Sequence, residues 1–136
     1  MTNANVTRKT ILVVEDSPTQ ALRLQSLLED RDLHVELAAN GRVGLHRARQ
    51  LRPDLVILDL EMPEMNGVEV CEALKTAPDT ADIPIIMFTS REDEEVVLYT
   101  LGLGIVDFIP KDVFADAVLL ETMRQMGLLD NGDGSG

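Results

Sequence analysis

The chain has 136 residues, enough for one domain with a single core, and 45% of them are hydrophobic. Its net charge of −12 argues against direct binding to nucleic acid, because the phosphate backbone requires a basic surface. The sequence has no apolar run as long as a membrane span and no signal-peptide core at residues 1–10. The single cysteine, Cys71, has no partner for an intramolecular disulfide. We therefore expect a cytoplasmic protein that neither inserts into a membrane nor binds nucleic acid directly.

Apolar runs and amphipathic patterns alternate five times along the chain. The runs predict strands at 10–14, 34–38, 55–59, 84–89 and 106–110. The patterns predict helices at 18–30, 41–51, 66–76, 92–103 and 112–129. In the first helical pattern, Ala21, Leu24 and Leu28 recur at the three- and four-residue spacing of one helix face. Ser17 and Asn66 precede two of the patterns and predict helix starts.

The runs at 10–14, 55–59 and 84–89 are almost continuously apolar, which is typical of parallel strands covered by helices on both faces. The run at 34–38 alternates between apolar and polar residues and suits the edge of a sheet. We predict an α/β fold, a doubly wound (βα)5 three-layer sandwich with strand order 2-1-3-4-5. It occupies residues 8–127, between an N-terminal tail at 1–7 and a flexible C-terminal tail at 128–136.

Polar side chains stand at the carboxyl ends of four of the predicted strands. Glu15 and Asp16 follow the first strand, Asp59 ends the third, Thr89 ends the fourth and Lys111 follows the fifth. In an open parallel sheet a ligand site lies at this edge, where the strand order reverses, and neighbouring strands are ~4.8 Å apart. Each residue alone has a plainer interpretation, as a turn residue, a helix cap or a solvated charge. Their conjunction at one edge indicates a site, with Asp16 facing Asp59.

Five motifs occur in a fixed order along the chain. They are ED (15–16), DLEMPEMNG (59–67), TS (89–90), G (104) and DFIPK (107–111). In these motifs, over about residues 8–127, the sequence resembles the receiver domains of two-component response regulators. The resemblance implies a flavodoxin-like fold and a histidine kinase or phosphotransfer protein as phosphodonor. It also implies a downstream protein partner, bound by the face that residues 92–103, 106–110 and 112–129 form.

The resemblance further implies roles for the acidic residues. Asp59 is the expected phosphoacceptor, and Asp16, Asp59 and the backbone carbonyl of Glu61 are the expected ligands of Mg²⁺. Glu15 is expected to act on the metal through a water molecule. General chemistry supports these roles, because a hard dication with oxygen ligands reduces the repulsion between a cluster of carboxylates and an incoming phosphoryl group. An acyl phosphate on an aspartate is also a known type of covalent intermediate.

Three more residues take roles by the same resemblance. Lys111 and Thr89 are expected to hold the phosphoryl oxygens, so that catalysis consists mostly of positioning and electrostatics. Thr89 and Phe108 are the expected switch residues, although Phe108 replaces the commoner tyrosine and has no hydroxyl group. Asp112 replaces the usual proline after Lys111. The peptide bond between them is therefore either trans or strained, since a cis bond before a non-proline residue costs ~2.5–4 kcal/mol.

Spacing adds three expectations around the site. Asp112 precedes an apolar helical pattern and is predicted to be the N-cap of the last helix. Glu61 stands two residues after Asp59, and Arg91 stands two residues after Thr89, so both should lie at the mouth of the site. Their opposite charges predict either an ion pair that modulates the phosphorylated state or two unrelated solvated side chains. The histidines, His34 and His46, are expected to be surface or helix residues, because no catalytic partner for them is visible.

Two other functions fit part of the sequence. An aspartate-nucleophile phosphatase of the haloacid dehalogenase type is the alternative, because Glu61 lies two residues after Asp59. Those enzymes carry their nucleophile after the first strand, whereas here the ED motif comes first. A receiver-like module that works without phosphorylation is disfavoured, because every phosphorylation residue is present. We therefore expect a signalling module rather than an enzyme, one that promotes only its own phosphorylation and dephosphorylation, with no DNA-binding output domain in this chain.

Overall fold

The computed structural model describes residues 8–91 and 93–130. Five strands alternate with five helices along the chain, as predicted from the hydrophobic pattern. The strands are β1 (Thr10–Val14), β2 (His34–Ala38), β3 (Leu55–Leu58), β4 (Ile85–Thr89) and β5 (Asp107–Pro110). The helices are α1 (Pro18–Glu29), α2 (Gly41–Leu51), α3 (Gly67–Thr76), α4 (Glu94–Gly102) and α5 (Ala115–Gln125). The predicted N-terminal tail, 1–7, and residues 131–136 of the C-terminal tail lie outside the described residues.

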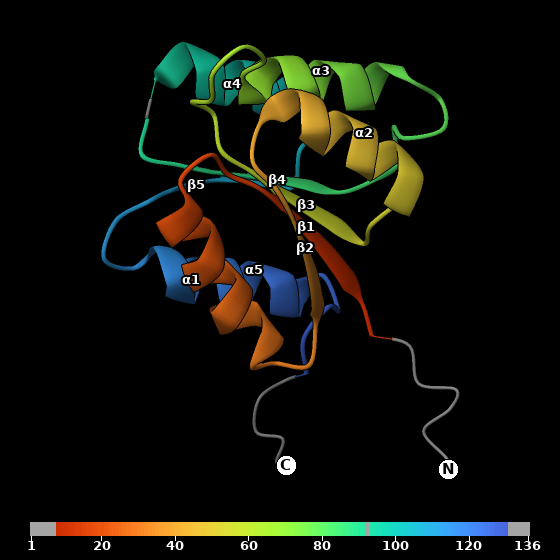
Figure 1. Ribbon diagram of the computed structural model, residues 1–136. Helices are drawn as coiled ribbons and strands as arrows, with labels where there is room; N and C mark the ends of the chain where they lie inside the picture. Colours follow the sequence, from red (N-terminus) through yellow and green to blue (C-terminus); the bar gives the residue numbers. More distant parts are fainter. Residues whose placement is uncertain (1–7, 92, 131–136) are drawn as a thin grey trace.

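The strands form one parallel sheet in the order β2-β1-β3-β4-β5, which confirms the predicted topology. Figure 1 shows α1 and α5 on one face of the sheet and α2, α3 and α4 on the other, so the molecule has three layers. The chain first adds β2 on one side of β1 and then returns to add β3 on the other side. The strand order therefore reverses between β1 and β3, where Val14 pairs with Leu58.

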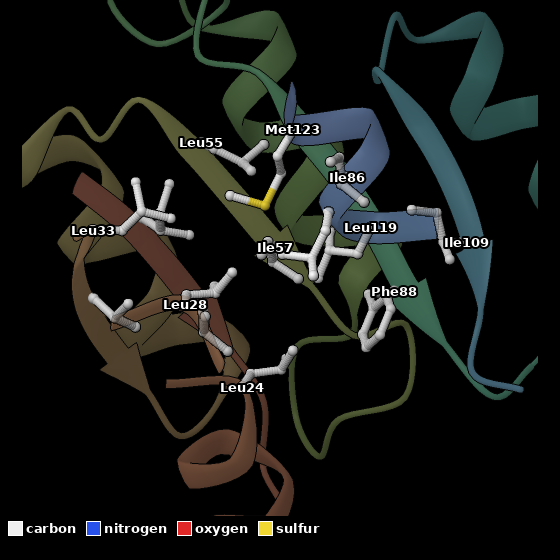
Figure 2. Packing of buried hydrophobic residues seen from close by; sticks show 14 of the residues in the cluster. Leu24, Leu28, Leu33, Leu55, Ile57, Ile86, Phe88, Ile109, Leu119 and Met123 are labelled. Carbon is white, nitrogen blue, oxygen red and sulfur yellow. The ribbon is translucent and has the colours of Figure 1, made fainter. Parts of the chain in front are cut away.

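The core consists of two apolar clusters, one on each face of the sheet. Successive residues of a strand point to opposite faces. In β1, Ile11 and Val13 belong to the cluster beneath α1 and α5, whereas Leu12 and Val14 belong to the cluster beneath α2, α3 and α4. Figure 2 shows the first cluster, with Leu24, Leu28, Leu33, Leu55, Ile57, Ile86, Phe88, Ile109, Leu119 and Met123 labelled. Burial on both faces explains why these strands are apolar along their whole length.

Side-chain caps fix the starts of two helices next to the carboxyl edge of the sheet. The Ser17 hydroxyl accepts a hydrogen bond from the Gln20 amide at 3.3 Å, and Pro18 begins α1. Asn66 and Glu69 form a capping box, in which each side chain accepts the backbone N–H of the other residue. Both helix starts predicted from the sequence are confirmed. The caps satisfy backbone amides that have no partner inside the helix.

Gly67, the first residue of α3, packs directly against the end of β3. A Cβ atom at this position would lie 2.3 Å from the carbonyl oxygen of Asp59, so only glycine fits. The Gly67 amide also donates a hydrogen bond to the carbonyl oxygen of Leu60 at 2.8 Å. This close contact fixes the backbone on which the Asp59 side chain stands.

The start of the last helix differs from the prediction. α5 begins at Ala115, and its N-cap position is held by Phe114 without a side-chain hydrogen bond. The prediction that Asp112 is the N-cap is therefore wrong, because the chain first makes a turn after Lys111. In that turn the Asp112 carboxylate accepts the Phe114 amide at 2.8 Å, and the Asp112 carbonyl accepts the Ala115 amide at 3.1 Å. The peptide bond between Lys111 and Asp112 is trans, which settles the alternative left by the missing proline.

The last helix also ends earlier than predicted, at Gln125 rather than at 129. Gly127 follows with a φ of 83°, a left-handed conformation that ends the helix. Beyond it, Leu128 and Leu129 are half-buried and pack against the cluster beneath α1 and α5. The predicted flexible tail begins at residue 128, whereas Leu128 and Leu129 pack with the domain in the structure.

Candidate functional site

Three carboxylates converge where the strand order reverses. Glu15 and Asp16 directly follow β1, and Asp59 directly follows β3, the strand paired with β1. One carboxylate oxygen from each residue lies within 4.8 Å of the other two. Glu15 is only 4% exposed and Asp59 only 9% exposed, whereas Asp16 is open to solvent. The predicted convergence of the three acids is confirmed.

Lys111 reaches these acids from the end of β5. Its ammonium nitrogen lies 2.7 Å from Glu15 Oε1 and 3.3 Å from Asp59 Oδ2, and the side chain is only 16% exposed. The backbone positions it, because the Lys111 amide donates to the carbonyl oxygen of Thr89 at 2.8 Å and so keeps the chain beside β4. The Phe88 ring lies beneath the ammonium group, with its centre 5.9 Å away, within range of a cation–π contact.

Both oxygens of the two buried carboxylates accept hydrogen bonds. Glu15 Oε1 accepts from Lys111, and Glu15 Oε2 accepts from the Ser17 amide at 3.1 Å. Asp59 Oδ2 accepts from Lys111, and Asp59 Oδ1 accepts from the Glu61 amide at 3.3 Å. The site therefore holds two nearly enclosed negative groups in fixed orientations. Such a buried charge is tolerated only when it is paired and hydrogen-bonded.

Burial raises the pKa of Glu15 above its ordinary value, and the negative charge of Asp59 acts in the same direction. Hydrogen bonds from Lys111 and from the Ser17 amide lower the pKa of Glu15, but they do not cancel the effect of burial. The site also places three acidic groups, which repel one another when ionised, beside a single lysine. A divalent cation would relieve this repulsion, and Mg²⁺ prefers a few carboxylate oxygens together with water. Buried Glu15 and Asp59 beside exposed Asp16 fit that requirement, because the exposed side leaves room for water.

Thr89 and Phe108 lie at different positions along the neighbouring strands β4 and β5. Thr89 ends β4 and is fully buried, and its hydroxyl accepts the Arg91 amide at 3.3 Å. Phe108 is half-buried on β5, where it packs against the cluster beneath α2, α3 and α4. It also lines a cavity of about 320 Å³ together with Val97 of α4 and Pro110. Thr89 therefore belongs to the carboxyl edge of the sheet, whereas Phe108 faces α4.

Glu61 and Arg91 form an ion pair, with Arg91 Nη1 lying 2.9 Å from Glu61 Oε2. Each side chain is 53% exposed, so the pair lies at the surface of the site, as the spacing predicts. Beside it is an open cavity of about 560 Å³, lined by both residues and by Asp16, with Met62 and Val96 as apolar walls. This cavity gives solvent access to the Asp16 side of the site, next to Val96 of α4.

The sequence alone missed Gln20, which lies in the first turn of α1. Its side-chain oxygen accepts a hydrogen bond from the Lys111 ammonium group. Ser17 was a partial sequence signal for Gln20, because it predicts a helix that begins at the carboxyl edge of the sheet, near the site. The two histidines are exposed, as expected, and His34 lies 2.6 Å from Glu36 rather than near the site.

The fold and site define a class of protein: a doubly wound α/β domain with a cluster of three carboxylates at its topological switch point. Comparison with known families is more specific, because the family model for the response regulator receiver domain matches residues 11–124. The chain belongs to this family of two-component signalling domains. Its resemblance to the family, inferred from the sequence motifs, is confirmed.

Known relatives include both short and long proteins. Protein PilH of Pseudomonas aeruginosa is 35% identical over 109 residues, which cover 80% of this chain and 90% of PilH. The signal transduction histidine-protein kinase BarA of Escherichia coli is 33% identical over 104 residues, or 76% of this chain. The chain spans only 11% of the length of BarA. Receiver domains therefore occur in proteins of very different size.

Solved structures agree with the fold. Chemotaxis protein CheY4 of Vibrio cholerae superposes with a TM-score of 0.79 at 29% identity, covering 88% of this chain and 98% of that chain. The signal receiver domain of a histidine kinase from Syntrophus aciditrophicus gives a TM-score of 0.77 at 38% identity, covering 94% and 97%. Among the described residues, no helix is both long enough and apolar enough to span a membrane.

Proposed function

We propose that Asp59 accepts a phosphoryl group from a phosphohistidine of a histidine kinase or phosphotransfer protein, in a reaction that depends on Mg²⁺. The observation that carries this proposal is the Lys111 ammonium group, 3.3 Å from Asp59 Oδ2 and braced by Glu15 at 2.7 Å. A lysine held beside a buried carboxylate supplies positive charge where phosphoryl oxygens arrive. Phosphoryl transfer needs little else from a protein than positioning and such charge.

In the transfer step, an Asp59 carboxylate oxygen forms a bond to phosphorus while the bond from phosphorus to the imidazole nitrogen of the donor breaks. The imidazole leaves with the electron pair of that bond, and the product is an acyl phosphate on Asp59. Lys111 exchanges its contact with Asp59 for a phosphoryl oxygen, and the Thr89 hydroxyl donates a hydrogen bond to another. Hydrolysis later returns the carboxylate, when water attacks phosphorus and the bond to the Asp59 oxygen breaks.

Asp16, Asp59 and the backbone carbonyl of Glu61 would hold the metal ion, and Glu15 would contact it through water. The ion supplies positive charge that offsets the repulsion between the acids and the phosphoryl group. The oxygen-only donor set and the open side at Asp16 support magnesium rather than a softer metal.

Phosphorylation switches partner binding through Thr89 and Phe108 in this proposal. When Thr89 turns toward the phosphoryl group, Phe108 repacks against α4, where the adjoining cavity of about 320 Å³ leaves space. The face formed by α4, β5 and α5 then binds a downstream protein. Exposed apolar side chains on this face support the assignment: Leu98, Leu101, Val106 and Val118. The domain acts as a signalling module that catalyses only its own phosphorylation and dephosphorylation.

Incubation with Mg²⁺ and acetyl phosphate, followed by intact-mass spectrometry, tests the site. We expect one added phosphoryl group, lost in Asp59→Asn and in the presence of EDTA. Asp54→Asn is the matched control, because Asp54 lies at the opposite end of β3 and accepts the Thr10 amide at 2.8 Å. Equal labelling of Asp59→Asn and the wild type would exclude this site. Sustained turnover of small phosphate esters would favour the phosphatase alternative instead.

A further inference from the structure

The Lys111 ammonium group has a hydrogen-bond acceptor for each of its three N–H donors. A lysine ammonium group has three donors and no acceptor. Here the acceptors are Glu15 Oε1 at 2.7 Å, Asp59 Oδ2 at 3.3 Å and the side-chain oxygen of Gln20. With Phe88 beneath it, the ammonium group is held from four directions.

Gln20 reaches this position because of the start of α1. The Gln20 backbone N–H donates a hydrogen bond to the Ser17 hydroxyl, so the helix cap fixes the backbone of Gln20 beside the end of β1. The residue is 91 positions away from Lys111 in the sequence, and only the fold, which brings the start of α1 to the carboxyl edge of the sheet, places the two side chains together. Gln20 also lines a cavity of about 410 Å³ with Lys111 and Ser90, and it is exposed whereas Lys111 is half-buried.

The three acceptors differ in what phosphorylation does to them. Asp59 loses its carboxylate charge when it becomes an acyl phosphate, whereas Glu15 and Gln20 keep their chemistry. Two contacts that persist define the position of the nitrogen, and the third donor is then free to follow the phosphoryl oxygen. A neutral amide also binds the ammonium group without adding negative charge to a site that already holds three carboxylates.

We propose that Gln20 is a positioning residue for Lys111. With Glu15 it holds the ammonium nitrogen in place, so that the third donor points first at Asp59 and then at the phosphoryl oxygen. The inference rests on the proposed function for its kinetic consequence, whereas the contact itself is independent of phosphorylation. Its test therefore needs one measurement with a phosphodonor and one without.

The kinetic measurement compares Gln20→Met with the wild type, using acetyl phosphate and saturating Mg²⁺. Methionine keeps the length of the side chain and removes the acceptor. We expect the phosphorylation rate to fall by about three- to tenfold, the range that one hydrogen bond typically accounts for. Gln25→Met, the same change five residues further along α1, is the matched control and should leave the rate unchanged. In a Lys111→Met background, Gln20→Met should have no further effect, because residues that act through one group are not additive.

The second measurement follows the mobility of Lys111 by ¹³C relaxation of its ε-methylene group, without phosphodonor. We expect its order parameter to fall in Gln20→Met and to be retained in Gln20→Glu, which keeps an oxygen acceptor at the same distance. Lys75 is the internal reference, because its ammonium group binds the carbonyl oxygens of Ala81 and Ile83. Its order parameter should not change.

The outcomes separate the two proposals. If the wild type takes up no phosphoryl group, the proposed function fails, and the relaxation measurement still decides whether Gln20 holds Lys111. If the wild type is phosphorylated and Gln20→Met matches it in both rate and Lys111 mobility, the role of Gln20 is overturned. Loss of rate in Gln20→Met that persists equally in the Lys111→Met background would also overturn it.

Discussion

Arg91 and Glu61 join two loops across the mouth of the site, with Arg91 Nη1 2.9 Å from Glu61 Oε2. Glu61 follows β3 and Arg91 follows β4, and the two residues are 30 positions apart in the sequence. The hydrogen bond and the charge of Glu61 raise the pKa of Arg91, which stays positive throughout the physiological range. Both side chains are half exposed, so the pair adds little to stability and its effect should be on rates.

We expect this pair to control how quickly water reaches phosphorylated Asp59. Glu61→Ala and Arg91→Ala should each change the rate of autodephosphorylation, measured as loss of the phosphorylated species over time. The double variant should change the rate by less than the product of the two single effects, because residues in contact are not additive. Effects that multiply would mean that the two side chains act independently.

Glu15 should make the metal-free protein less stable at neutral pH. Burial raises its pKa in the folded state above the ordinary value of 4.5, so the folded state binds a proton more tightly than the unfolded state. The contribution of Glu15 to stability is therefore fully present below about pH 4.5 and is lost as the pH rises through the raised folded pKa.

Glu15→Gln removes this titration and keeps an oxygen acceptor for Lys111. In EDTA at pH 7, urea denaturation should give the variant a higher free energy of unfolding than the wild type. The advantage should shrink at pH 4, where the wild-type carboxyl group is protonated in both states. A lower stability of the variant at pH 7 would mean that the ion pair with Lys111 outweighs the effect of burial.

Asp112 should stabilise the turn before α5 and take no part in metal binding. Its carboxylate accepts the Phe114 amide at 2.8 Å, and the side chain is exposed. Asp112→Ala should lower the free energy of unfolding by about 0.5–1 kcal/mol, the usual effect of losing one such hydrogen bond. Asp112→Asn, which keeps the acceptor, is the matched control. Titration calorimetry should give the same Mg²⁺ affinity for all three proteins, and a large loss of affinity would contradict this role.

Cys71 should react with thiol reagents only when the protein unfolds. The residue is fully buried in α3, and burial raises the pKa of its thiol to about 11. The thiolate is the reactive form, so both access and chemistry protect the group at neutral pH. Iodoacetamide should leave the native protein unlabelled over a time in which the urea-unfolded protein is fully modified. Rapid labelling of the native protein would show that α3 opens readily.

The hydrophobic pattern was sufficient to predict the sheet and its order. Strands buried on both faces must be apolar along their length, and right-handed crossovers leave few other arrangements. Once the order is known, residues directly after the strands have little freedom. The convergence of Asp16 and Asp59 could therefore be predicted, because Val14 and Leu58 pair at the ends of adjacent strands.

Interactions that depend on how a turn closes or how a helix packs could not be derived in this way. Asp112 is a residue type that often caps helices, but the chain makes a turn after Lys111 and the helix begins only at Ala115. Leu128 and Leu129 were predicted to begin the tail, but the way α5 ends places them against the core.

Gln20 illustrates the same limit within the site. By itself the sequence determined which residues stand at the carboxyl edge of the sheet, because strand order and the two-residue period fix their places. Only the tertiary structure decided that a glutamine in the first turn of α1 binds Lys111, 91 residues away. That contact depends on the rotation and distance of a helix packed on the sheet, and these are set by the side chains of the cluster beneath α1 and α5 acting together rather than by any local pattern.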